Sequence, residues 1–217
     1  MINGLLTGFE PADISMSAFK SQAASLCELA GADGVAYAVG HEGLNPVEEK
    51  TIKLLKDIVS IPLAVIIPTA DRAAEKIIEL RPDMVGVTTI NSNTQDFITR
   101  LQVADIVTAV RTDPDIEMVR DAAKIKADYV ILDATQYCKE KSLSNKLAML
   151  DKIAKAAGLA KRLSMGTILG GPLALSDIAK FGEIEGIEEF FIGHGLAAKA
   201  VLFGLEKAIH TYKATLN

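Results

Sequence analysis

The tripeptide Gly193-His194-Gly195 combines residue types that can bind an anion. It follows the apolar run Phe190-Phe191-Ile192, and a helical pattern starts directly after it at Leu196. Glycines let backbone N–H groups approach a ligand closely, and the N-terminus of a helix carries a partial positive charge. The pattern therefore predicts a phosphate site. The alternative is a tight turn that needs glycine only for its backbone dihedral angles.

Other apolar runs also end in residues that can do chemistry. Asp133 closes the run Tyr129-Val130-Ile131-Leu132, where burial can raise the pKa of an acid; the alternative is the cap of a turn. Arg111 can clamp a carboxylate or a second phosphate, or form a loop ion pair. His41 and Glu42 form a possible acid/base pair in a glycine-rich loop. We predict Asp133, His194, His41 and Glu42 as catalytic residues, and Asn3, Thr88, Arg111 and Thr135 as other pocket residues.

The histidines and cysteines do not indicate a metal or a cofactor. The three histidines are widely separated in the sequence, and no cluster of His, Asp or Cys ligands surrounds them. We therefore predict no metal and no cofactor. Cys27 falls in a helical pattern and is predicted to be core, whereas Cys138 falls in a polar loop where it could be reactive.

Composition limits the classes of partner. The chain has 217 residues, 49% of them hydrophobic and 24% charged, with a net charge of -5. This charge and the scattered lysines and arginines argue against nucleic acid or an anionic membrane as partner. No signal peptide and no membrane-spanning run is recognisable. Two cysteines without a disulfide framework fit a reducing cytosol. We expect a cytoplasmic protein that binds a small molecule and forms a homo-oligomer.

A repeated pattern of Ala or Pro, then Asp, then any residue and Val, indicates the architecture. It occurs around Asp33, Asp83, Asp105 and Asp128, each time where a helical pattern ends and an apolar run begins. Such continuous apolar runs are typical of parallel strands that are covered on both faces. The predicted strands lie near Ile2, Val35, Leu63, Val85, Ile106, Val130, Leu163 and Phe190. The predicted helices include 15–29, 48–59, one that begins at 113–115 with Pro114 in its first turn, 144–157 and 196–209.

Eight strands that alternate with helices predict one (β/α)8 TIM barrel over residues 1–217. An open doubly wound sheet is the alternative, but no G-x-G-x-x-G follows the first strand. In a TIM barrel, phosphate often binds after strands seven and eight. Those strands end at Gly170-Gly171 and Gly193-His194-Gly195, so we predict Gly170, Gly171, Gly193, His194 and Gly195 as phosphate-binding residues.

The C-terminal segment 187–209 (IEEFFIGHGLAAKAVLFGLEKAI) resembles the last strand and helix of the pyridoxine 5'-phosphate synthase family, and Ala30-Gly31-Ala32-Asp33-Gly34-Val35 resembles the entry to its second strand. The resemblance implies a TIM barrel, usually assembled into an octamer. It also implies condensation of 1-deoxyxylulose 5-phosphate with 3-amino-2-oxopropyl phosphate in vitamin B6 biosynthesis. Gly193 and His194 correspond to the family's closing phosphate pocket, and Asn3 to an Asn on its first strand.

Several family positions are changed in this chain. Leu5-Leu6 stand where the family has Asp-His, and 38–42 stand where it has His-Leu-Arg-Glu-Asp. A Glu on the third strand of the family falls at about Val65. The Glu-x-His-Thr-Gly of the sixth strand reads 131–135 here, and the Asn-Ala-Gly-His-Gly of the seventh strand reads 168–172.

Three functions follow from this comparison of motifs, in order of preference. The first is a divergent enzyme, of transferase or lyase type, that keeps the phosphate-binding site and acts on a small phosphorylated metabolite. The second is a catalytically silent barrel that serves as a ligand sensor or a structural subunit. The third is retained pyridoxine 5'-phosphate synthesis with substituted catalytic groups.

Overall fold

The structure is a computed structural model of the whole chain. It describes residues 2–3, 15–40, 42–70 and 74–216, and within these ranges it describes side chains from Lys20 onward.

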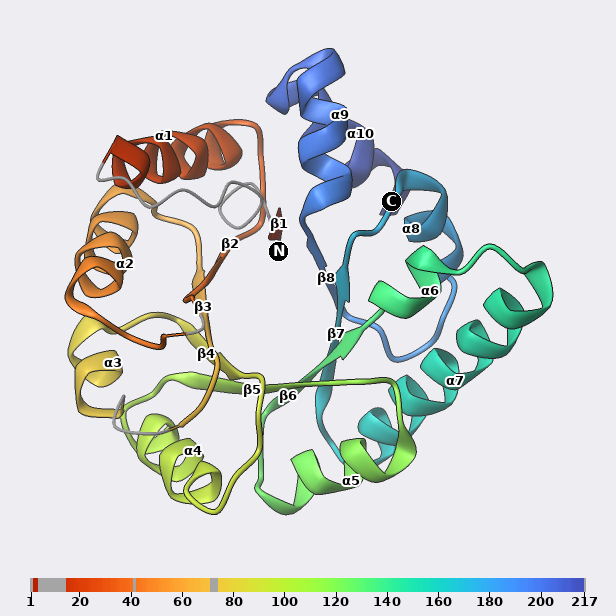
Figure 1. Cartoon of the computed structure of the whole chain (residues 1–217), viewed down its shortest axis with the longest axis horizontal. Coiled ribbons are helices and arrows are strands. Elements are labelled where there is room, and N and C mark those ends of the chain that lie inside the picture. The colour runs from red at the N-terminus through yellow and green to blue at the C-terminus, as the bar shows by residue number, and fades with distance from the viewer. Residues whose placement is uncertain (1, 4–14, 41, 71–73, 217) are drawn as a thin grey trace.

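Eight parallel strands form one sheet, in the order in which they occur in the sequence. Figure 1 shows them as a central ring with the helices outside, and the first and last strands contact each other. The predicted (β/α)8 barrel is confirmed; that residues 1–217 form a single domain stays a prediction. The strands are β1 (Ile2–Asn3), β2 (Val35–Ala38), β3 (Leu63–Ile67), β4 (Met84–Val87), β5 (Val107–Thr112), β6 (Tyr129–Asp133), β7 (Gly166–Gly171) and β8 (Glu189–Ile192).

Two of the helices begin at a residue whose side chain caps them. Asn45 accepts hydrogen bonds from the backbone of Val47 and Glu48, and Asp115 caps the fifth helix in the same way. Pro114 therefore precedes this cap and does not lie in the first turn, contrary to the prediction. The helices are α1 (Ser15–Leu29), α2 (Pro46–Ile58), α3 (Ala74–Leu80), α4 (Thr94–Val103), α5 (Ile116–Lys124), α6 (Thr135–Lys139), α7 (Leu143–Arg162), α8 (Leu175–Phe181), α9 (His194–Phe203) and α10 (Leu205–Leu216).

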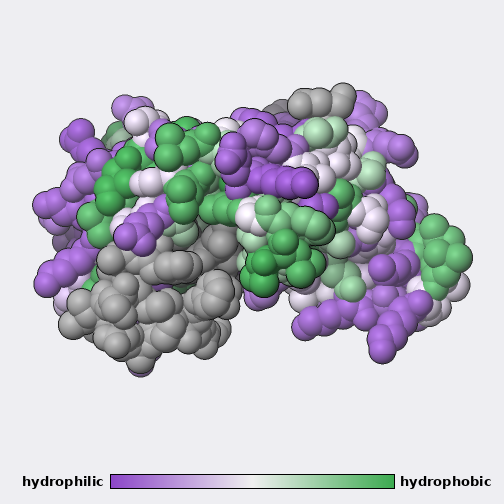
Figure 2. All heavy atoms as spheres, turned by 90° about the horizontal axis from the view of Figure 1, so that it is seen from above, coloured by the Kyte–Doolittle hydropathy of each residue, from purple (hydrophilic) through white to green (hydrophobic). Residues whose placement is uncertain are grey.

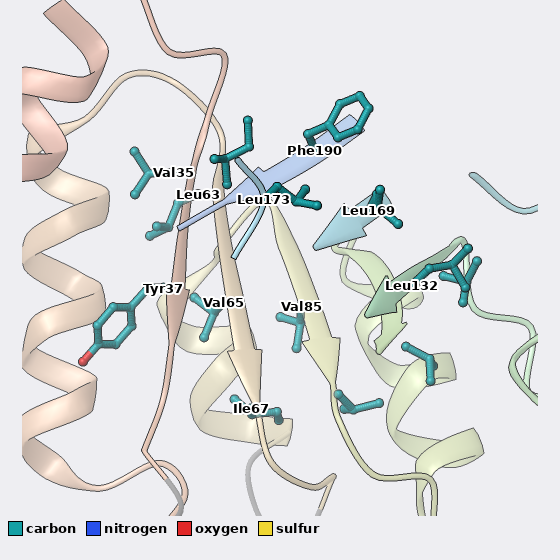
Figure 3. Close-up of a cluster of buried hydrophobic side chains, with 14 of the residues drawn as sticks. Val35, Tyr37, Leu63, Val65, Ile67, Val85, Leu132, Leu169, Leu173 and Phe190 are labelled. Atoms are coloured by element: carbon teal, nitrogen blue, oxygen red, sulfur yellow. The ribbon is translucent and has the colours of Figure 1, made fainter. Parts of the chain in front are cut away.

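Side chains alternate along each strand between two apolar layers. On β3, Leu63, Val65 and Ile67 belong to a large cluster that also contains helix residues, so they face the helices (Figure 3). Ala64 and Ile66 belong to a second cluster whose buried members all come from strands, so they fill the inside of the barrel. This inner cluster includes Ile131 and Phe191, and it forms the floor beneath the carboxyl ends of the strands.

Two of the four repeated aspartates, Asp83 and Asp128, stabilise the opposite, amino end of the barrel. Asp83 accepts hydrogen bonds from the backbone N–H of Leu63 (2.8 Å) and from Lys56 Nζ (2.6 Å). Asp128 accepts from the backbone N–H of Thr108 (2.8 Å) and from its hydroxyl (2.6 Å). Each of these aspartates thus ties the start of one strand to the start of a preceding strand, which is a structural role.

The last strands and helices differ from the prediction in two places. Strand β7 begins at Gly166, because α7 continues to Arg162 and Leu163 forms its C-cap. The predicted helix 196–209 is divided into α9 and α10 by Gly204, whose φ of 83° lies in the left-handed region. Within the described residues, no helix combines the length and apolarity needed to cross a membrane.

Helix α9 extends away from the ring of strands (Figure 1). Leu196 is its buried residue, whereas Val201, Leu202 and Phe203 near its end are 80%, 74% and 55% exposed. Helix α9 is therefore apolar on its exposed side. In Figure 2, which views the molecule from above Figure 1, apolar side chains gather in the middle of the face.

Candidate functional site

A pocket of about 380 Å³ opens at the carboxyl ends of the strands. Its polar lining comes from β5, from α6, from the ends of β7 and β8, and from the start of α9, and its apolar lining includes members of the inner cluster. Polar and glycine residues of the lining are Arg111, Thr135, Lys139, Gly170, Gly171, Gly193 and His194. Apolar residues of the lining are Ile66, Ile131, Pro172 and Phe191.

The glycine turns after β7 and β8 lie side by side at one edge of this pocket. Gly171 is in register with Ile192, so Gly193 follows directly beside it. Gly193 is the N-cap of α9, and no side chain of the described residues caps this helix. The first N–H groups of α9 are therefore available to an acceptor at this end. Gly171 has a φ of 142°, and a Cβ on it would lie 3.3 Å from the backbone nitrogen of Thr135.

Gly195 has a packing role that the sequence did not reveal. A Cβ at this position would lie 2.0 Å from the carbonyl oxygen of Leu173 and 2.7 Å from the hydroxyl of Tyr212. Gly195 is not part of the pocket lining, unlike Gly170, Gly171 and Gly193. Close packing of α9 explains this glycine, and its predicted part in phosphate binding stays a prediction.

Arg111 and Asp133 form an ion pair at the mouth of the barrel. Arg111 donates from Nε and Nη2 to Asp133 Oδ2, at 3.1 and 2.7 Å, and the backbone N–H of Thr135 donates to Asp133 Oδ1 at 2.8 Å. Both alternatives weighed from the sequence are thus present, since Asp133 caps a turn and Arg111 is ion-paired. Arg111 lines the pocket and Asp133 does not.

The pKa of Asp133 is lowered, so the expectation of a raised value is wrong. Burial acts to raise this pKa, but the hydrogen bonds from Thr135 and the charge of Arg111 together outweigh it. At neutral pH Asp133 is a carboxylate whose two oxygens are already engaged. It is poorly suited to donate or accept a proton in a reaction, and well suited to orient Arg111.

The other predicted site residues lie away from the pocket or outside the described residues. Glu42 is exposed in the turn after β2, and Thr88 is exposed after β4, where its hydroxyl donates to the carbonyl of Pro68 at 3.1 Å. Neither lines the pocket. His41 lies outside the described residues. Asn3 is described only through the backbone of β1, in register with Ala36.

Lys139 is a pocket residue that the sequence did not reveal. It lies four residues after Thr135 on the short helix α6, and both residues line the pocket. The i, i+4 spacing places them on one face of the helix. Cys138 also lies on α6 and not in a loop, and burial raises the pKa of its thiol to about 11. Cys27 is buried in α1 as predicted, and burial raises its pKa to about 11 as well.

Metal binding has no support in the part of the chain that the structure describes. There, no group of three or more His, Cys, Asp or Glu side chains is arranged to hold an ion.

Several solved structures share the fold of this chain, although their sequence identity to it is low. Thiamine phosphate pyrophosphorylase from Pyrococcus furiosus has a TM-score of 0.66 at 12% identity, covering 99% of this chain and 93% of its own. A 4-hydroxy-2-oxoglutarate aldolase/2-deydro-3-deoxyphosphogluconate aldolase from TTHB1 has a TM-score of 0.66 at 10% identity, covering 96% and 91%. At such identities the likeness shows the barrel fold alone.

Sequence comparison gives the family. The pyridoxine 5'-phosphate synthases of Geotalea uraniireducens (strain Rf4) and Citrifermentans bemidjiense (strain ATCC BAA-1014 / DSM 16622 / JCM 12645 / Bem) are each 30% identical to this chain in an alignment 203 residues long, which covers 86% of the chain and 84% of each relative. Residues 19–217 match the family model described as "Pyridoxal phosphate biosynthesis protein PdxJ". The chain therefore belongs to the family of pyridoxal phosphate biosynthesis protein PdxJ, whose curated relatives are named pyridoxine 5'-phosphate synthase.

Proposed function

We propose that this chain is an enzyme that binds a small phosphorylated metabolite in the pocket at the carboxyl ends of its strands, with chemistry changed from that of the family. The observation that carries the proposal is the composition of that pocket. Glycine turns and an uncapped helix N-terminus lie at one edge, Lys139 and His194 lie in the lining, and none of the described residues that line the pocket is acidic. This arrangement suits the phosphate group of a small ester.

Two isoleucines that line the pocket, Ile66 and Ile131, support the proposed change of chemistry. Ile131 stands where the resembled family has the glutamate of its sixth strand. Val65, the approximate position of the third-strand glutamate, faces the helices, and its neighbours Ala64 and Ile66 face the inside of the barrel. Every candidate for an inward side chain on β3 is thus apolar. Because a general acid or base contributes roughly 10²–10⁴-fold to a rate, losing two of them would slow the family reaction severely.

His194 is the residue that we propose as proton carrier. It lies at the start of α9, is exposed, and lines the pocket beside Gly193. Histidine is the side chain whose charge commonly changes between about pH 5 and 8. Asp133 acts instead through Arg111, as a positioning residue. No catalytic part is assigned to Glu42, which lies away from the pocket.

Retained pyridoxine 5'-phosphate synthesis is the second candidate, because the family match covers most of the chain. Purified protein incubated with 1-deoxyxylulose 5-phosphate and 3-amino-2-oxopropyl phosphate distinguishes the two. Formation of pyridoxine 5'-phosphate that is lost in His194→Ala would favour retained synthesis. If neither this pair nor a panel of sugar and acid phosphates is turned over, the barrel is catalytically silent, which is the remaining alternative.

Phosphate binding is tested separately from catalysis. We expect calorimetry to detect glycerol 3-phosphate binding, and Lys139→Gln to weaken it about tenfold because a charge-assisted hydrogen bond is lost. Lys141→Gln is the matched control, since Lys141 is an exposed lysine just beyond α6 that does not line the pocket. Equal losses in the two variants, or no binding by the unmodified protein, would contradict the proposed site.

A further inference from the structure

Arg111 has hydrogen-bond donors that have no partner among the described residues. Its Nε and Nη2 both donate to one oxygen, Asp133 Oδ2, and among the described residues Nη1 has no hydrogen-bond partner. The side chain is 32% exposed and lines the pocket, whereas Asp133 does not line it. The ion pair thus fixes one edge of the guanidinium and leaves the other edge to a ligand.

Arg111 lies apart from the glycine turns, although it lines the same pocket. It projects from β5, and β6 separates this strand from β7, which ends in Gly170-Gly171. On β6 its register partner is Ile131, an apolar residue of the pocket lining. A ligand that contacts both sites therefore needs two polar ends joined by a short chain of carbon atoms over an apolar floor.

We propose that Arg111 recognises a carboxylate, so that the ligand is a small phosphate monoester with a carboxylate at its other end, such as a phosphorylated hydroxy or oxo acid. Arg111 is then a specificity-determining residue, and Asp133 positions it. This inference rests on the proposed phosphate site at the glycine turns.

The geometry of the guanidinium favours a carboxylate over other second groups. Arginine presents a planar fork that donates two parallel hydrogen bonds to the two oxygens of a carboxylate. A ketone or hydroxyl offers only one oxygen, so it could not accept the two parallel hydrogen bonds of the guanidinium. A second phosphate would add up to about two negative charges close to the carboxylate of Asp133, whereas a carboxylate adds one.

The test uses two ligands that differ only at the proposed carboxylate position. 3-Phosphoglycerate and glycerol 3-phosphate share a three-carbon chain and a phosphate ester, and they end in a carboxylate and a hydroxymethyl group respectively. We expect calorimetry to show that the unmodified protein binds 3-phosphoglycerate at least about tenfold more tightly. In Arg111→Lys, which keeps the charge but loses the fork, this preference should fall to about twofold or less.

A second variant guards against a folding defect. Arg111→Met combined with Asp133→Asn removes both charges, so no unpaired carboxylate remains, and it should also abolish the preference while glycerol 3-phosphate still binds. A preference that survives in both variants, or equal binding of the two ligands by the unmodified protein, would overturn the carboxylate inference and leave the proposed phosphate site standing. If inorganic phosphate and glycerol 3-phosphate do not bind at all, the proposed function fails, and this inference fails with it.

Discussion

At the scale of single residues, the ion pair of Asp133 makes a prediction about stability and pH. In Asp133→Asn, Arg111 loses its partner, and since the two side chains are 24% and 32% exposed we expect a loss of about 1–2 kcal/mol in the free energy of unfolding at pH 7. The folded-state pKa of Asp133 lies below the ordinary value of an aspartate, about 3.9. Its contribution is therefore complete above the unfolded pKa and is lost as the pH falls through the folded pKa.

Urea denaturation at several pH values measures this contribution. The difference between the unmodified protein and Asp133→Asn should be the same at pH 7 and pH 5 and should shrink below about pH 4. A difference that stays constant down to pH 3 would show that the ion pair is not its cause.

The two cysteines, one buried and one partly buried, make a second prediction at this scale. Burial raises the pKa values of both Cys138 and Cys27 to about 11, so at pH 8 only about one thiol in a thousand is a reactive thiolate. Iodoacetamide should label the folded protein at least about tenfold more slowly than the urea-unfolded protein, as measured by mass spectrometry of the peptides. Rapid labelling of one equivalent at Cys138 in the folded state would mean that this thiol is open to solvent and ionised.

What the sequence reveals of the site depends on whether the signal is local. Gly170, Gly171, Gly193 and His194 were predicted from turns whose residues are adjacent in the sequence, and all four line the pocket. The lowered pKa of Asp133 was not predicted: the hydrogen bonds from Thr135 that lower it are local, but Arg111, whose charge lowers it further, lies 22 residues away on another strand. Exclusion of Glu42 and Thr88 from the pocket likewise depends on how the loops after β2 and β4 are placed.

At the scale of elements, the helices with long periodic patterns were predictable and the short ones were not. The range of α1, Ser15–Leu29, agrees with the prediction residue for residue, because the apolar spacing of 3.6 residues extends over several turns. Helix α6 has five residues, too few to show a period, and this is why Lys139 was missed. A lone glycine within a helical pattern is often tolerated, so the break at Gly204 was not evident either.

The packing of α9 makes a prediction about Gly195. In Gly195→Ala, the new Cβ would meet the backbone carbonyl of Leu173, which cannot rotate away, so α9 must shift. We expect a loss of about 2 kcal/mol or more in the free energy of unfolding, measured in urea.

Gly158→Ala is the control for this substitution. Gly158 lies inside α7, and a Cβ there would have Arg162 Nη1 as its nearest neighbour, at 3.7 Å. The better helix propensity of alanine should therefore raise the free energy of unfolding by up to about 1 kcal/mol. Opposite signs for the two variants are the expected outcome, and an unchanged stability of Gly195→Ala would show that α9 does not pack as described.

At the scale of the whole molecule, the barrel follows from the sequence because two independent signals agree. Continuous apolar runs indicate strands covered on both faces, and the repeated aspartates mark their starts. In the structure, Asp83 and Asp128 accept hydrogen bonds from the backbone of Leu63 and Thr108 respectively, which explains why these two members of the repeat stand at strand starts. The outer surface of the barrel is less predictable, because helical periodicity shows which residues are apolar and not whether another element covers them.

The exposed end of α9 makes a prediction about assembly. Val201, Leu202 and Phe203 are consecutive, apolar and largely exposed on a helix that extends from the barrel, and solvent contact of such a cluster is unfavourable. Because the resemblance to the family implies an oligomer, we predict that a second copy of this chain covers the cluster. Leu202→Glu should then lower the molar mass of the assembly in light scattering, whereas Val103→Glu should not, because Val103 is 82% exposed at the end of a different helix. An unmodified protein that is monomeric at high concentration, or an assembly unaffected by Leu202→Glu, would show that α9 does not mediate self-association.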